Sequence, residues 1–327
     1  MDFLSVDSLP WLQGPQRRMR EALSARRLPH ALLLLSVPGL GAEQLANWIA
    51  ALVLCESETT RPCGACASCQ LLRADSHPDC HVVRIEEDAQ QIKVDQIRQL
   101  IESLTLSSYR GGYKVGLVEG AEALNANGAN AFLKTLEEPT DNTLLIMVAK
   151  PSHRLPATIA SRCMRVQLRA PERAAALGWL EGQGEKHGNW SAALELAGGA
   201  PLLAVEFEKV GIAALEQEMQ EHLRQMAAGA VDVTLLAGSW VKSEENLRLI
   251  WLENWITRRI HAYCGATSSL QSAEPVRLPA ALLKPKIRAL FELLDASREL
   301  RRFAATGLNQ QLALEGLLLG GRAALAK

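Results

Sequence analysis

The sequence has few aromatic residues and no excess of charge of either sign. Only 5% of its 327 residues are Phe, Trp or Tyr, and 35 Lys and Arg residues stand against 36 Asp and Glu residues. A formal net charge of −1 excludes the broad basic field with which a free-standing DNA-binding protein attracts phosphate backbones. Any contact with nucleic acid must therefore be local, or be made through another protein.

Long apolar runs are also missing. No stretch offers the roughly 18 charge-free apolar residues of a membrane span. The first residues, MDFLSVDSLPWLQGP, lack the basic segment and apolar run of a secretory leader. We therefore expect a soluble, cytoplasmic protein.

The length and the apolar patterns predict several domains. A chain of 327 residues exceeds one ordinary core, because domains usually hold about 100 to 200 residues. Short apolar runs at 31–37, 114–119 and 143–149 alternate with helical patterns, which predicts a parallel α/β sheet covered on both faces. After about residue 170 only helical periodicity remains.

Three domains are expected from this change of pattern. An α/β domain should occupy residues 1–168, and a small helical lid residues 169–208. A helical bundle should occupy residues 209–327.

The turn after the first apolar run has the form of a phosphate loop without its chemistry. A working loop reads G-x-x-x-x-G-K-[ST], because backbone amides cradle phosphate, Lys neutralises it and the hydroxyl holds magnesium. The window SVPGLGAE retains Gly39 and Gly41. Ala42, however, stands where Lys belongs, and Glu43 where Ser or Thr belongs. A carboxylate at Glu43 would occupy the electrostatic niche of a phosphate and repel nucleotide. Taken alone, PGLG also fits a plain turn between a strand and a helix.

A second motif of such ATPases, a pair of acids, is also incomplete. ATPases of this type end a strand with two acids, one for magnesium and one to activate water. Here the strand ends KVGLVEGAEAL, so Glu119 can stand for the first acid and Gly120 replaces the second. The base that activates water is therefore absent.

Four cysteines have the spacing of a metal site. Cys55, Cys63, Cys66 and Cys69 follow C-x7-C-x2-C-x2-C, and Gly64 allows a tight turn between them. Four thiolates with no vacant position suit a structural zinc ion. A redox thiol pair or unligated cysteines are the alternatives.

The remaining thiols and a nearby histidine are expected to be structural. Cys80, Cys163 and Cys264 lie outside the cluster and have the character of ordinary buried or half-buried thiols. His77 is interpreted as a turn residue before Pro78 rather than as a fifth ligand, because four cysteines already complete the shell.

Two motifs carry a family resemblance. The string NANGANAFLKTLEEP, followed by ATIASRC, resembles the bacterial clamp-loader subunits of the AAA+ family, and so does RRLPHALLLLSVPGLG before the turn. The resemblance covers residues 1 to about 208 well. It implies an AAA+ sheet domain with a zinc knuckle at 55–69, a helical lid and a C-terminal helical collar.

The departures from working ATPases place the chain on one branch of that family. Within it, gamma/tau subunits keep an intact phosphate loop, and delta-prime subunits have lost it. The altered loop therefore resembles the delta-prime branch of DNA polymerase III. Ala149, where an ATP-sensing Thr or Ser is common, and Leu202, where a sensing Arg is common, agree with it.

The resemblance also implies a function. The chain would be a stator that binds no nucleotide productively and is neither an ATPase nor a polymerase on its own, although it belongs to the DNA polymerase III complex. Arg162 of the SRC motif would be an arginine finger for ATP in a neighbouring subunit, a role that suits a permanently charged guanidinium. Without the family, Arg162 would be taken for an ordinary helix-end arginine. The KTLEEP motif is interpreted as a family signature that is structural, with Lys134, Glu137 and Glu138 solvated.

The implied partners are the other parts of the loader. They are the gamma/tau and delta subunits, the sliding clamp (beta) and, through the assembled ring, primer–template DNA.

Two other functions remain open at this point. One is an autonomous ATPase with an altered loop, which turnover by the lone chain would reveal. The other is a zinc-containing nucleic-acid adaptor. The cysteine segment has few basic and no aromatic residues, so it offers little for base stacking.

Overall fold

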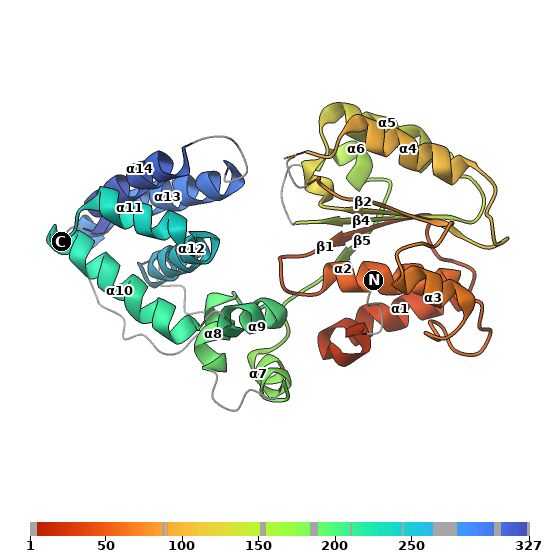
Figure 1. The fold of residues 1–327 in the computed structure, drawn as a ribbon, viewed down its shortest axis with the longest axis horizontal. Coiled ribbons are helices and arrows are strands. Elements are labelled where there is room, and N and C mark those ends of the chain that lie inside the picture. Colours follow the sequence, from red (N-terminus) through yellow and green to blue (C-terminus); the bar gives the residue numbers. More distant parts are fainter. Residues whose placement is uncertain are drawn as a thin grey trace. The chain divides into compact units, whose positions relative to one another are not determined.

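The chain divides into two compact units (Figure 1). The computed structural model describes residues 5–86, 89, 91–150, 155–183, 189–209, 211–243, 245–263, 280–303 and 309–325. The first unit comprises Met1–Arg173 and Ala200–Leu203, and the second comprises Ala174–Gly199 and Ala204–Lys327. Cys264 lies outside the described residues.

A five-stranded sheet forms the centre of the first unit, and its strand order is β2-β3-β4-β1-β5. All of the pairings are parallel. The strands are β1 (Ala31–Leu35), β2 (Cys80–Val83), β3 (Lys114–Glu119), β4 (Thr143–Ala149) and β5 (Met164–Gln167). Every residue of β4 is buried, as expected for a central strand of a sheet covered on both faces. The predicted parallel α/β fold is confirmed.

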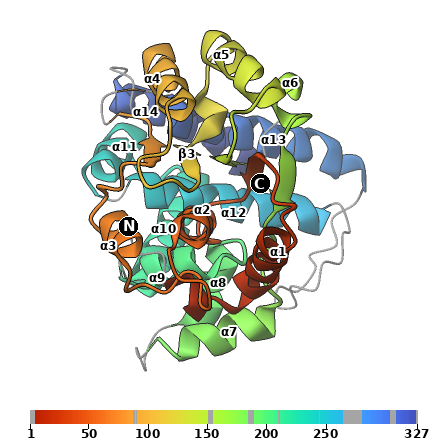
Figure 2. The same ribbon diagram turned by 90° about the vertical axis from the view of Figure 1, so that its right-hand side faces the viewer.

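Helices cover both faces of this sheet. Figure 1 shows α4, α5 and α6 on one face and α1, α2 and α3 on the other, and Figure 2 shows the same separation from the side. The helices are α1 (Gln13–Ser24), α2 (Ala42–Leu54), α3 (Ala67–Arg73), α4 (Val94–Thr105), α5 (Ala126–Glu137) and α6 (Ala157–Ala160). The described residues of this unit also form 3-10 turns at Ser5–Ser8, Pro10–Leu12 and Ala121–Ala123.

Helix α2 illustrates how the apolar pattern sets the packing. Leu45, Trp48, Ile49 and Leu52 are each at most 1% exposed, and this is the stripe that their helical spacing predicts. Each such side chain contributes about 1.5 to 3 kcal/mol through the apolar surface that it removes from water. The buried stripe fixes the helix against the sheet, so the turn before α2 and the cysteines after it have defined positions.

The second unit is helical. It contains α7 to α14, apart from the first residues of α7 and α9, which belong to the first unit. The helices are α7 (Arg173–Glu181), α8 (Trp190–Leu196), α9 (Pro201–Lys209), α10 (Ile212–Ala228), α11 (Val233–Lys242), α12 (Glu245–Tyr263), α13 (Ala280–Phe303) and α14 (Gln310–Leu325). Helix α13 packs against α12 and α14, and α11 packs against α14. In the described part of the chain, no helix is both long and apolar enough to cross a membrane.

Candidate functional site

The four predicted cysteines converge on one point. Their sulfur atoms all lie within 4.8 Å of one another. The Sγ atoms of Cys55 and Cys66 are 3.9 Å apart, and those of Cys63 and Cys69 are 4.0 Å apart. A zinc–sulfur distance of about 2.3 Å implies tetrahedron edges of about 3.8 Å. The cluster therefore has the dimensions of a tetrahedral thiolate site and could hold a zinc ion.

Local backbone structure brings these sulfurs together. Cys55 directly follows α2, and Cys66 is the N-cap of α3, where its sulfur accepts a hydrogen bond from the Cys69 amide at 3.4 Å. Between them, Gly64 has a φ of 72°, a left-handed conformation that glycine adopts without strain. The end of one helix and the start of the next thus present their cysteines to a common centre.

The backbone also favours the charged form of one ligand. Amides of Ala65 and Cys66 donate to the Cys63 sulfur and lower the pKa of this thiol to about 6. Burial raises the pKa of Cys69 above its ordinary value, and a bound cation would reverse that cost because metal ligation deprotonates a thiol. A set of four sulfurs and no oxygen ligand suits zinc rather than calcium or magnesium. His77 is not among the residues grouped at this point, and its Nδ1 accepts a hydrogen bond from the Asp79 amide.

Two acids that the sequence did not single out tie this module to the sheet domain. Glu56 accepts hydrogen bonds from Ser68 at 2.8 Å and from Nε of Arg110 at 3.0 Å. Asp79 is 4% exposed. Its carboxylate accepts from the amides of Tyr109 and Arg110. The loop before β3, which contains Tyr109 and Arg110, is therefore bonded to both Glu56 and Asp79.

The phosphate-type loop lies between β1 and α2, as predicted, and it is covered by its own chain. The amide of Leu202 donates to the Gly39 carbonyl at 3.1 Å. A Cβ atom at Gly39 would lie 2.5 Å from Cβ of Leu203. The first turn of α9, which contains Leu202, therefore rests directly on the loop. Ala42 is buried and Glu43 is exposed.

The acid at the end of β3 has a partner in the chain. Arg84 binds both carboxylate oxygens of Glu119, with Nε at 2.7 Å and Nη2 at 3.2 Å. Both carboxylate oxygens of Glu119 therefore already have a cationic partner. Gly120 has a φ of 76°, so the missing second acid falls at a position where any side chain is strained.

A cavity of about 290 Å³ joins the loop to the strand ends. Besides Glu119 and Arg84, its lining includes Glu43, Glu122 and Lys150. Lys150 meets Glu122 twice, through its amide at 3.2 Å and its Nζ at 3.7 Å. Two of the three carboxylates are therefore compensated by cations of the same chain. Ala149, the last residue of β4, also lines this cavity and offers no hydroxyl.

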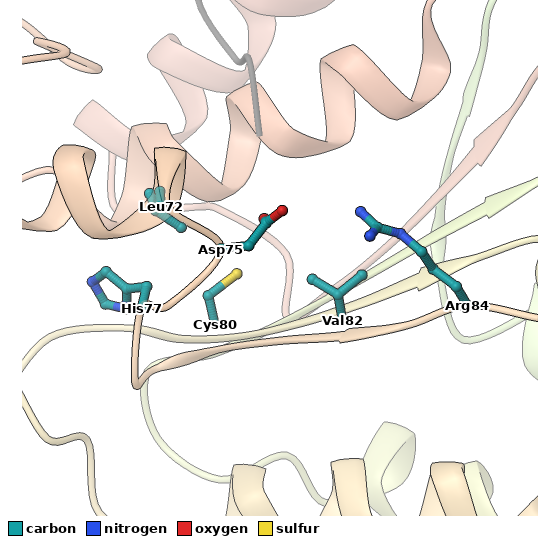
Figure 3. Close-up of a pocket in the computed structure, with 6 residues that line it drawn as sticks. All are labelled: Leu72, Asp75, His77, Cys80, Val82 and Arg84. Atoms are coloured by element: carbon teal, nitrogen blue, oxygen red, sulfur yellow. The ribbon is translucent and has the colours of Figure 1, made fainter. Parts of the chain in front are cut away.

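A second cavity, of about 230 Å³, lies beside β2 (Figure 3). Figure 3 shows Asp75 and Arg84 extending into the same space, Cys80 and Val82 pointing toward it from the strand, and the His77 ring turned away. Burial raises the pKa of Cys80 to about 12. This thiol stays protonated, so we assign it no chemistry, in agreement with the sequence prediction.

Arg162 lies near the amino-terminal ends of the strands, whereas the phosphate-type loop lies at their carboxyl-terminal ends. Arg162 precedes β5 by two residues, and Met164, which begins β5, pairs with Leu32 near the start of β1. The loop instead follows the end of β1. Because a five-residue strand spans about 15 Å, the Arg162 guanidinium is far from the loop of its own chain.

The guanidinium of Arg162 is bound to the KTLEEP motif. Its Nη2 donates to Oε1 of Glu137 at 2.5 Å, and its Nη1 donates to the Thr158 carbonyl at 2.9 Å. Glu137 is exposed, as the sequence predicts, and it also has an ion-pair partner that the sequence did not indicate. Helical spacing shows only that Glu137 points outward, and it says nothing of a partner 25 residues away.

The sequence is similar to those of known DNA polymerase III subunits. A family model described as DNA polymerase III, delta subunit, matches residues 13–172. The DNA polymerase III subunit delta' of Pseudomonas aeruginosa is 36% identical over 254 residues, 76% of each chain. That of Yersinia pestis is 32% identical over 329 residues, 97% of this chain and 96% of the relative. A solved gamma subunit-related protein from Thermotoga maritima aligns over 94% of this chain and 99% of its own, with 17% identity and a TM-score of 0.46.

The sequence likeness extends over nearly the whole chain, and it coincides with a phosphate-type loop that lacks its Lys and hydroxyl. Both findings point to the branch of the clamp-loader proteins predicted from the motifs, and the chain belongs to the DNA polymerase III delta-prime subunit family.

Proposed function

We propose that this chain acts in a clamp loader as a stator that completes the ATP site of a neighbouring subunit with Arg162. The position of Arg162 carries this proposal. The Arg162 side chain is 36% exposed. It lies near the amino-terminal ends of the strands, away from the phosphate-type loop of its own chain. An arginine at this position could contact the phosphates of ATP bound by another chain, where it would stabilise the negative charge that develops during hydrolysis.

The chain itself binds no nucleotide productively under this proposal. Ala42 cannot neutralise phosphate, and Glu43 brings a negative charge to the place of the magnesium-binding hydroxyl. Arg84 already occupies both oxygens of Glu119. The first turn of α9 lies on the loop at Gly39. Four separate features thus oppose nucleotide binding and hydrolysis.

The cysteine cluster is proposed to hold one structural zinc ion. Cys55, Cys63, Cys66 and Cys69 would be its ligands, and the ion would supply a fixed cross-link without redox chemistry. Metal analysis of the purified protein should give about one zinc per chain. Zinc-free protein with the same thermal stability would contradict this part.

The proposed partners follow from the same role. They are the gamma/tau and delta subunits, with the sliding clamp and primer–template DNA reached through the assembled complex. The proposed domain division is 1–168, 169–208 and 209–327, and the last of these would form the oligomerisation collar. The helices of this last part bury Trp240 and Trp251.

The test is ATP turnover of a reconstituted loader, stimulated by DNA and clamp, with either wild-type protein or Arg162→Ala. We expect the variant to assemble and to lose the turnover that depends on this finger, because an arginine finger contributes about 10³-fold or more at its own site. Arg165→Ala is the matched control, since Arg165 is three residues away, exposed and bonded to the Ala160 carbonyl.

Other outcomes would overturn the proposal. Unchanged stimulation with Arg162→Ala would make this residue structural. ATP turnover by the lone chain would instead restore the autonomous ATPase.

A further inference from the structure

The carboxylate of Glu137, in the KTLEEP motif, accepts a hydrogen bond from the guanidinium of Arg162, in the SRC motif. Glu137 is the last residue of α5, and Arg162 follows the short helix α6, which packs against α5. The distance between Oε1 of Glu137 and Nη2 of Arg162 is 2.5 Å. The pair thus joins two segments that only the tertiary fold brings together.

The place of Glu137 is fixed by how its helix ends. Glu138 leaves the helical conformation with a φ of −128°, because the following Pro139 disfavours a helical residue before it. Leu136, one residue earlier, is 3% exposed, and its carbonyl contacts the His30 ring at 3.1 Å. The carboxylate therefore projects from an anchored helix end, which is also the negative end of the helix dipole and attracts a cation.

The contacts of Arg162 leave part of its guanidinium available. A guanidinium has five N–H donors. Nη2 donates to Glu137, and Nη1 donates to the Thr158 carbonyl and more weakly to Ser161. No described residue accepts a hydrogen bond from Nε. The group is held on one side and can still donate on the other.

We propose that Glu137 is a positioning residue for Arg162, an inference that rests on the proposed role of Arg162 as a trans finger. Glu137 fixes the direction of the guanidinium and stays bound while the free donors reach the phosphates of the neighbouring subunit. An arginine side chain has several rotatable bonds, so without this contact it would spend most of its time away from the productive orientation.

The first experiment compares Glu137→Ala with wild-type protein in the reconstituted loader. The kcat of DNA- and clamp-stimulated ATP turnover should fall about fivefold to tenfold, the effect of one charge-assisted hydrogen bond at a half-exposed site. The KM for ATP should change less than about twofold, because a finger acts mainly in the transition state. Glu138→Ala is the matched control, since Glu138 is adjacent and exposed, and it should leave both constants unchanged.

A double-mutant comparison separates positioning from a general structural effect. In the Arg162→Ala background, Glu137→Ala should cause no further loss, because its effect passes through the missing guanidinium. The Tm of the lone subunit and the assembly of the loader should match those of Glu138→Ala. A further loss in the double variant, or a lowered Tm, would make Glu137 structural and overturn the inference.

The remaining outcomes distinguish this inference from the proposed function. If Arg162→Ala abolishes stimulation and Glu137→Ala has no effect, the finger stands and positioning by Glu137 is wrong. If Arg162→Ala has no effect, the proposed function itself fails. Faster turnover with Glu137→Ala would show that the carboxylate restrains the finger, and would also overturn the inference.

Discussion

Two glycines with the same backbone conformation differ in what surrounds them. Gly39 has a φ of 82° and Gly111 a φ of 72°, so any other residue is strained at either position. A Cβ at Gly39 would also lie 2.7 Å from the backbone nitrogen of Leu203, whereas one at Gly111 would meet nothing within 4 Å. Backbone cannot move aside as a flexible side chain can, so the two substitutions should differ in cost.

We predict that Gly39→Ala lowers the free energy of unfolding by about 2 to 4 kcal/mol, the sum of left-handed strain and overpacking. Gly111→Ala should cost about 1 kcal/mol, from strain alone. Chemical denaturation of both variants measures the difference. Equal losses would mean that the first turn of α9 does not rest on the loop in solution.

His222 is a residue at which stability depends on pH. Burial lowers its pKa, and Nε1 of the buried Trp240 donates to its Nδ1 at 3.3 Å. An indole nitrogen only donates, so His222 must be neutral to accept this bond. Glu218 and Glu221 raise the pKa and Arg248 lowers it, but burial is the largest cause.

The sign of the pH effect follows from this lowered pKa. Below about pH 6.5, the ordinary value of histidine, the unfolded chain binds the proton more readily than the folded one, so stability falls as pH falls. We predict that the Tm drops more between pH 7.5 and 5.5 in wild-type protein than in His222→Gln, which keeps an acceptor and cannot titrate. Parallel Tm curves for the two proteins would contradict this.

Residue identities were predictable where a motif fixed the position, and ion-pair partners were not. The sequence alone indicated the missing Lys at Ala42 and the missing acid at Gly120, because the motif gives their spacing. Arg84, Glu56 and Glu137 were missed as partners, since each pairs with a residue at least 12 positions away. No periodic pattern records such a pairing, and only the folded sheet brings it about.

Among the elements, the segment that contains the four clustered cysteines and α3 depends most on contacts other than apolar packing. Helix α3 has seven residues, too few to persist alone in water, and its first turn is capped by the sulfur of Cys66. If zinc holds the cluster, removing the metal should unfold this segment while the sheet remains.

We predict that a chelator greatly increases hydrogen exchange at the amides of residues 63–73 and leaves those of β1 and β4 protected. Cys66→Ser should lower the zinc content, and Cys80→Ser, outside the cluster, should not. Unchanged exchange in α3 after complete loss of zinc would show that the module folds without metal.

Elements with strong apolar patterns were predicted, and short half-exposed ones were not. The sequence indicated β1, β3, β4, α2 and α4, whose buried faces repeat at the period of a strand or helix. Strands β2 and β5 have four residues each and are largely exposed or half-buried. Edge strands of this length carry too little alternation to separate them from loops.

The whole molecule contains two compact units, each with its own buried residues. Chains with more than one core commonly depart from two-state unfolding. We predict at least two calorimetric transitions. Gly39→Ala should lower the one that belongs to the first unit, and His222→Gln should reduce the acid-induced lowering of the other. A single transition that shifts in both experiments would contradict independent unfolding.

The charges around the cavity at the phosphate-type loop determine how many changes an ATPase site would need there. Arg84 and Lys150 neutralise Glu119 and Glu122 from within the chain, so a mutation of Ala42 back to Lys would add a third cation to a site whose acids are already occupied. Hydrolysis would further require a hydroxyl in place of Glu43, release of Glu119 from Arg84, and an acid in place of Gly120, where the backbone is strained for any other residue. Under the proposed role, no single substitution would therefore give this chain ATP hydrolysis, because these positions would all have to change together.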